Sequence, residues 1–120
     1  MRTFSVRAIR TQQTPAMPID AEELLEELAR IESTLREAAR RQGQGCEPEF
    51  ERRMQAHLRS VRSMLDADGV ALAADTLEAA QRVMVSADAA APLLMMEMAR
   101  KSLRAFVQRQ AAARRIRDAA

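Results

Sequence analysis

The sequence predicts an all-α protein, a small bundle of four amphipathic helices in which the C-terminal helix is long. Apolar residues recur at helical spacing in four separate segments. Each segment also begins or ends near residues that favour helix termini. A chain of 120 residues, 48% of them apolar, is long enough for one domain with a modest core. We therefore expect residues 1–18 to form a flexible basic tail and residues 19–120 to form a single helical domain.

The first predicted helix, residues 20–42, has the clearest start signal. Asp20 is placed to cap the free amides, and Glu23 occupies the capping-box position three residues later. Gly43 and Gly45 then end the helix. Its apolar residues repeat in steps of four and three, a spacing typical of helices that pack together: Leu24, Leu28, Ile31, Leu35 and Ala38.

Two shorter helices are predicted next, over residues 48–66 and 70–86. Pro48 is a good first residue for the earlier one, and Asp66, Asp68 and Gly69 are expected to break it before the later one begins. The expected inner faces are Phe50, Met54, Leu58, Val61 and Leu65 in the earlier helix and Val70, Ala73, Leu77, Ala80 and Met84 in the later one. The small alanines favour close approach of a neighbouring helix.

The fourth predicted helix, residues 89–117, is the longest. Ser86 and Asp88 compete as its N-cap, and Pro92 is compatible only with a position in or before its first turn. One apolar stripe runs from Leu93 to Ile116. Because this helix is longer than the other three, we expect its C-terminal part to project from the bundle or to pair with another chain.

Composition favours self-association over a monomer. The chain has no Trp or Tyr and only three Phe. A core of Leu, Ala, Met and Val buries less area per residue than one with aromatics, so burial against a second chain, as a homodimer, would compensate.

Charge is distributed unevenly along the chain. Residues 19–45 carry seven acids and four arginines, whereas residues 99–120 carry seven bases and one acid. Such asymmetry can indicate contact with nucleic acid or membrane. It also fits a basic last helix that packs on the acidic first helix of its own chain or of a sister chain, which is the interpretation we favour.

Cysteine use and hydropathy predict a cytoplasmic protein that does not contact a membrane. The lone cysteine, Cys46, excludes an intramolecular disulfide and fits a reducing compartment. No stretch approaches the roughly 20 apolar residues of a membrane span, and the N-terminus lacks the apolar core of a secretory signal. Arginine outnumbers lysine 18 to 1, which is typical of a GC-rich bacterial gene.

No catalytic, cofactor or metal-binding motif is present, so we expect no enzyme, no cofactor and no metal. His57 lacks a sequence-fixed nucleophile or orienting carboxylate and is expected to be a packed or half-exposed structural residue. Cys46 and His57 have no repeat partners that would complete a zinc site. Cys46 is expected to be an incidental loop thiol rather than a redox sensor. The three glycines are all expected in turns, and a solvated helix face is expected for Glu22, Glu23, Glu26 and Glu27.

The strongest candidate for partner binding lies near the start of the fourth helix. Three methionines within four residues cannot all face one narrow core, so part of this flexible, polarisable surface is expected to meet a second protein. Neighbouring basic residues would aid encounter and orientation. The candidate partner-binding residues are Met95, Met96, Met98, Arg100, Lys101 and Arg104.

The stretch Leu-Leu-Met-Met-Glu-Met-Ala-Arg-Lys-Ser-Leu at residues 93–103 follows a helix centred on Phe50. From about Asp20 onward, the chain resembles the small helical quorum-sensing antiactivators of the QslA type in size, helical order and composition. The resemblance implies a dimeric protein that binds the ligand-binding domain of a LuxR-type transcription factor. By occupying the dimerisation surface of that regulator, it would prevent activation of promoters. No residue roles are carried over.

Two other functions fit the same pattern. A secretion or flagellar export chaperone is also small, helical and Met-rich, and shields an apolar segment of its client. A small nucleic-acid-binding protein would instead use the basic last helix against phosphates, through Arg104, Arg114, Arg115 and Arg117. Helix-turn-helix punctuation and stacking aromatics are lacking, which makes this second alternative the weaker one.

Overall fold

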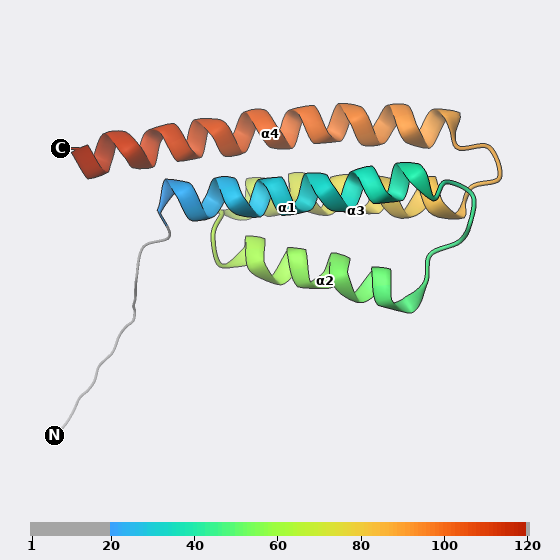
Figure 1. Cartoon of the computed structure of the whole chain (residues 1–120). Coiled ribbons are helices and arrows are strands. Elements are labelled where there is room, and N and C mark those ends of the chain that lie inside the picture. Colours follow the sequence, from blue (N-terminus) through green and yellow to red (C-terminus); the bar gives the residue numbers. More distant parts are fainter. Residues whose placement is uncertain (1–19, 120) are drawn as a thin grey trace, which may run out of the picture.

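The computed structural model describes residues 20–119, and this part of the chain consists of four helices without strands (Figure 1). They are α1 (Ala21–Arg40), α2 (Pro48–Arg62), α3 (Ala67–Val85) and α4 (Ala90–Ala119). Helices α1 and α3 form the middle of the bundle, with α4 covering one side and α2 the other (Figure 1). The all-α prediction is confirmed. The tail expected over residues 1–18 lies outside the described residues.

One apolar core joins the four helices. The predicted stripe of α1 is buried along its whole length, from Leu24 to Ala38. Helix α3 contributes four of its five predicted inner residues to the core, and Val70 packs against it half-buried. Ala73 and Ala80 have no exposed surface, so they allow the neighbouring helices to approach α3 closely. The other helices add Phe50, Met54 and Val61 from α2 and Met96, Leu103, Val107 and Ala111 from α4.

The predicted start and end of α1 are confirmed. Asp20 accepts a hydrogen bond from the Glu23 amide at 2.8 Å, and the Glu23 side chain accepts one from the Asp20 amide at 3.3 Å. After the helix, Gly43 and Gly45 adopt φ angles of 75° and 91°, which favour glycine. Their amides donate to the carbonyls of Val83 (3.1 Å) and Met84 (2.7 Å), so this loop satisfies free acceptors at the end of α3.

The predicted boundary between α2 and α3 is wrong by several residues. Helix α2 ends at Arg62, and Asp66 caps α3 by accepting a hydrogen bond from the Gly69 amide at 3.1 Å. Gly69 therefore lies in the first turn of α3 and not in a connecting turn. A Cβ atom there would lie 2.7 Å from Phe106 Cε1 and 2.8 Å from Leu65 Cβ. Close packing against α4 explains why glycine occupies this position. The periodicity of the sequence does not indicate such a contact.

Helix α4 begins as expected, and its C-terminal end projects past α1. Asp88, rather than Ser86, accepts a hydrogen bond from the Ala90 amide at 3.1 Å, and Pro92 lies in the first turn. Ala111 is still buried, and Arg115 pairs with Glu22 at the start of α1 at 2.7 Å. The C-terminal end of α4 extends past the start of α1 (Figure 1), and residues 115–119 are exposed.

Leucine-to-alanine substitutions test the assignment of inner and outer faces. Leu28 and Leu77 are 4% and 3% exposed, so truncating either should lower the free energy of unfolding by about 2–5 kcal/mol. Leu94 is 63% exposed, and Leu94→Ala should change it by less than about 0.5 kcal/mol. Urea denaturation of the three variants measures this. A loss at Leu94 equal to that at Leu28 would show that the outer face of α4 is buried.

Candidate functional site

The structure divides the methionine cluster between the core and the surface. Met96 is 6% exposed and belongs to the core, whereas Met95 and Met98 are 52% and 61% exposed. The expectation that the three methionines could not all face the core is confirmed, but Met96 is removed from the partner-facing set. Leu94, which is not among the predicted partner-binding residues, is 63% exposed. It lies one helical turn before Met98 on the same face of α4, a spacing that the sequence already contained.

We call Leu94, Met95 and Met98 the α4 apolar cluster. Within residues 20–119, five large apolar side chains are well exposed. Three of them form this cluster, and the other two are Val85 and Ile116. Isolated exposed apolar side chains are ordinary, but adjacent ones on one helix face indicate a contact surface. The α4 apolar cluster is therefore the best-supported candidate site.

Both predicted partner-binding arginines, Arg100 and Arg104, are engaged within the chain. Glu32 of α1 is 8% exposed and accepts hydrogen bonds from Arg100 at 3.0 Å and from Arg104 at 2.6 Å. Arg100 also pairs with Glu97 on its own helix. The Arg100 guanidinium lowers the pKa of the Glu97 carboxyl. In turn, the carboxylates of Glu97 and Glu32 raise the pKa of Arg100. Arg100 and Arg104 therefore bind α4 to α1 instead of lying free for a partner.

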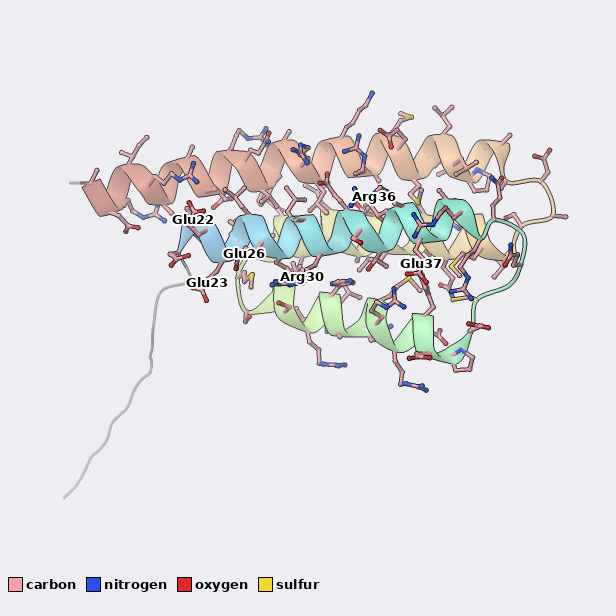
Figure 2. All side chains as sticks on the ribbon, in the orientation of Figure 1. Glu22, Glu23, Glu26, Arg30, Arg36 and Glu37 are labelled. Carbon is pink, nitrogen blue, oxygen red and sulfur yellow. The ribbon has the colours of Figure 1, made fainter. Side chains whose placement is uncertain are left out.

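The same pairing of charge extends to the far end of the bundle. Glu22, shown at the start of α1 in Figure 2, accepts a hydrogen bond from Arg115 at 2.7 Å. Arg114 donates to the backbone carbonyl of Met64, which follows α2. The interpretation that the basic last helix packs on the acidic first helix is confirmed within one chain. Lys101, the third predicted basic residue of the site, makes no ion pair within the described part of the chain.

A groove of about 210 Å³ lies beside the cluster, between α1 and α4. Its apolar lining comes from Leu35, Ala39 and Met96, and its charged lining from Glu32, Arg36, Glu97 and Arg100. Figure 2 shows Arg36 on the side of α1 that faces α4. Arg100 pairs with Glu32 across the groove and with Glu97 on its own helix, so much of this lining is already engaged within the chain.

A buried polar network joins α1 to α2. His57 is 8% exposed, with Nδ1 at 3.0 Å from Glu27 Oε2 and Nε2 at 2.8 Å from Thr34 Oγ1. Because an ionised carboxylate only accepts, His57 Nδ1–H donates to Glu27, and His57 Nε2 forms its hydrogen bond with the Thr34 hydroxyl. Glu27 also pairs with Arg30 at 2.9 Å. The expectation that Glu27 lies on a solvated face is therefore wrong, because it is 4% exposed and satisfies a buried histidine from the neighbouring helix.

The order hydroxyl, imidazole, carboxylate occurs in hydrolytic triads, but its setting here is that of a packing contact. Thr34 is 4% exposed and lies between helices, so its hydroxyl is not presented to a cleft. His57 is therefore a packed structural residue, as expected. The hydrogen bonds of His57 to Glu27 and Thr34 join α2 to α1 at defined positions, and a shift of α2 would leave these buried polar groups unsatisfied, which is costly.

A second set of polar contacts joins α2 to the C-terminal end of α1. Glu37, labelled in Figure 2, accepts hydrogen bonds from Arg53 at 2.6 Å and from Arg41 at 3.0 Å. These bonds, Arg53 first, lower the pKa of the Glu37 carboxyl. The Arg53 guanidinium lies 5.2 Å from the centroid of the buried Phe50 ring, a cation–π distance.

Cys46 and the metal-binding residue types give no further site. Cys46 is half-buried, and burial raises the pKa of its thiol, which disfavours the reactive thiolate. Between residues 20 and 119, the structure brings no three His, Cys, Asp or Glu side chains together in a way that could hold a metal ion. None of the four helices combines the length and apolarity needed to cross a membrane.

The chain matches no protein-family model, and comparisons with curated proteins and with solved structures also give no match. The resemblance to QslA-type antiactivators therefore stays a prediction.

Substitution of Glu32 tests whether the α1–α4 bridge stabilises the fold. Glu32→Gln removes the charge from a side chain that is 10% exposed and is shared by two arginines, so it should lower the free energy of unfolding by about 1–3 kcal/mol. Glu78→Gln is the matched control, since the Glu78–Arg82 pair is more than half exposed and 3.4 Å long. It should cost less than about 0.5 kcal/mol in urea denaturation. Equal losses for the two variants would contradict a specific role for Glu32.

The lowered pKa of Glu37 predicts a pH-dependent contribution to stability. A carboxyl whose pKa is lower in the folded than in the unfolded state stabilises the fold above the unfolded pKa, and this stabilisation is lost as pH falls through the folded pKa. Glu37→Gln should therefore be less stable than the natural sequence at neutral pH, and the difference should vanish in acid. Denaturation midpoints at several pH values measure the difference. A constant difference across the acid range would mean that the charge of Glu37 contributes nothing.

Proposed function

We propose that this chain is a non-enzymatic protein-binding inhibitor that contacts its target through the α4 apolar cluster. The observation that carries the proposal is the exposure of Leu94, Met95 and Met98, at 63%, 52% and 61%, on a helix whose opposite face is buried in the core. Burial of such a surface against a partner removes apolar area from water. Methionine side chains are flexible enough to adapt to the shape of the partner.

An inhibitor that works by binding must compete with the other contacts of its target. Blocking the dimerisation of a regulator requires a sizeable apolar contact, because homodimer interfaces are themselves more apolar than ordinary surface. The α4 apolar cluster supplies the core of such a contact, and Lys101 lies one turn after Met98 to aid encounter. The resemblance to QslA-type antiactivators suggests the target, which is the ligand-binding domain of a LuxR-type transcription factor.

The contacts of α4 favour a protein partner over nucleic acid. Of the seven bases after residue 98, Arg100, Arg104 and Arg115 pair with carboxylates, and Arg114 donates to a backbone carbonyl. These contacts leave less of the basic charge available for phosphates.

An export chaperone would use the same apolar cluster on a different client. Homodimer formation and a cytoplasmic location stay predictions of the sequence.

Polar substitution of the exposed cluster tests the proposal. Leu94→Gln and Met98→Gln should each weaken binding to a LuxR-type ligand-binding domain by at least about tenfold, because each removes a central apolar contact. Ile116→Gln is the matched control, as Ile116 is 72% exposed near the opposite end of α4 and its substitution should leave binding unchanged. Isothermal titration calorimetry measures binding, and urea denaturation confirms that each variant stays folded.

Two results would overturn the proposal. One is a failure of the natural chain to bind the regulator domain. The other is tight, salt-sensitive binding of DNA or RNA that is lost when Arg114, Arg115 and Arg117 are neutralised, which would support a nucleic-acid-binding function. Binding of an export substrate through Leu94 and Met98 in place of the regulator would support the chaperone alternative.

A further inference from the structure

Helix α4 has a second helical stripe on its solvent side. The core contacts come from Met96, Leu103, Val107 and Ala111. On the opposite face, exposed residues recur in steps of three and four, the spacing at which side chains of one helix meet those of another. We call this face the outer stripe, and its members are Ala91, Leu94, Met98, Lys101, Ala105, Gln108 and Ala112.

The apolar side chains of the outer stripe differ in size. Leu94 and Met98 are large, whereas Ala91, Ala105 and Ala112 are small. Small residues let the backbone of a second helix approach closely, and large ones fill the spaces between its side chains. A helix that packs along α4 would therefore contact large apolar side chains at Leu94 and Met98 and could approach closely at Ala105 and Ala112.

Charge on this face favours an acidic partner. No Asp or Glu occurs between Met98 and Arg117. Lys101 lies on the outer stripe without an ion pair among the described residues, and Arg109 beside the stripe lies with its guanidinium 6.0 Å from the centroid of the Phe106 ring. A second copy of this chain, laid along the same basic stretch, would bring like charges together. A helix with carboxylates beside its apolar stripe would instead gain attraction from them.

We propose that the outer stripe binds an amphipathic α-helix of a partner protein that carries acidic residues beside its apolar face. This inference rests on the proposed function, because it specifies the chemistry of the partner surface that would contact the α4 apolar cluster. The apolar contacts at Leu94 and Met98 supply affinity, and the carboxylates of the partner meet Lys101 and Arg109. An amphipathic helix would be recognised in this way through apolar side chains spaced along one of its faces.

Two synthetic helical peptides of about three heptads test the proposal. Both carry the same Leu/Ala stripe, but one has Glu and the other Lys at the flanking positions. Fluorescence anisotropy with the full chain should show binding of the Glu peptide at least about tenfold tighter than the Lys peptide, with the preference reduced by added salt. Lys101→Glu combined with Arg109→Glu should reverse the preference, and Leu94→Gln combined with Met98→Gln should abolish binding of both peptides.

A matched control separates local charge from net charge. Arg52→Glu combined with Arg59→Glu makes the same change in net charge on the exposed face of α2, on the other side of the bundle from α4. This variant should keep the preference for the Glu peptide. Loss of the preference in this control, equal affinity for both peptides, or no binding of either would overturn the proposal.

The remaining outcomes distinguish this proposal from the proposed function. A regulator complex that is weakened by Leu94→Gln but unaffected by the Lys101/Arg109 double variant would leave the inhibitor function intact and reject the acidic helix. A homodimer that dissociates on Leu94→Gln, seen by sedimentation, would assign the outer stripe to a second copy and also reject it. Binding of the Glu peptide without any regulator complex would support the outer stripe and reject the regulator as its target.

Discussion

The packing of α4 on α1 and α3 determines which side chains of α4 face solvent. One side of α4 is buried in the core through Leu103, Val107 and Ala111. Glu32 of α1 forms ion pairs with Arg100 and Arg104 of α4. These contacts set both the rotation and the register of α4. Because α4 is fixed in this way, Leu94 and Met98 cannot turn inward without exposing an equal apolar surface on the other side.

Helix α2 depends on a different kind of interaction. It lies on the opposite side of the bundle from α4 and is joined to α1 through His57 in the interior and through Glu37 and Arg53 near the surface. Buried polar groups of this kind contribute less to net stability than apolar packing does, but they are costly to leave unsatisfied. They therefore specify one position of α2, while the apolar contacts of Phe50 and Met54 supply most of the burial energy.

Much of the fold could be predicted from the sequence because its signals are local. The capping box at Asp20 and the spacing from Leu24 to Ala38 each depend on residues within a turn or two of each other. The errors occur where distant residues decide. Gly69 marks contact with Phe106 rather than a helix end, and Glu27 is buried because His57 from another helix needs an acceptor. The partner surface was predicted only in part for the same reason, since the rotation of α4 separates Met96 from Met95 and Met98.

The orientation of α4 is tested most directly by the rate of methionine oxidation, measured site by site by mass spectrometry after brief exposure of the folded protein to hydrogen peroxide. Oxidation of a thioether requires access of the oxidant to sulfur. Met95 and Met98 should oxidise rapidly, and Met96 should be as protected as Met84, which has no exposed surface. Oxidation of Met96 as fast as that of Met98, or protection of Met98 equal to that of Met84, would contradict the arrangement on which the proposed interaction surface depends.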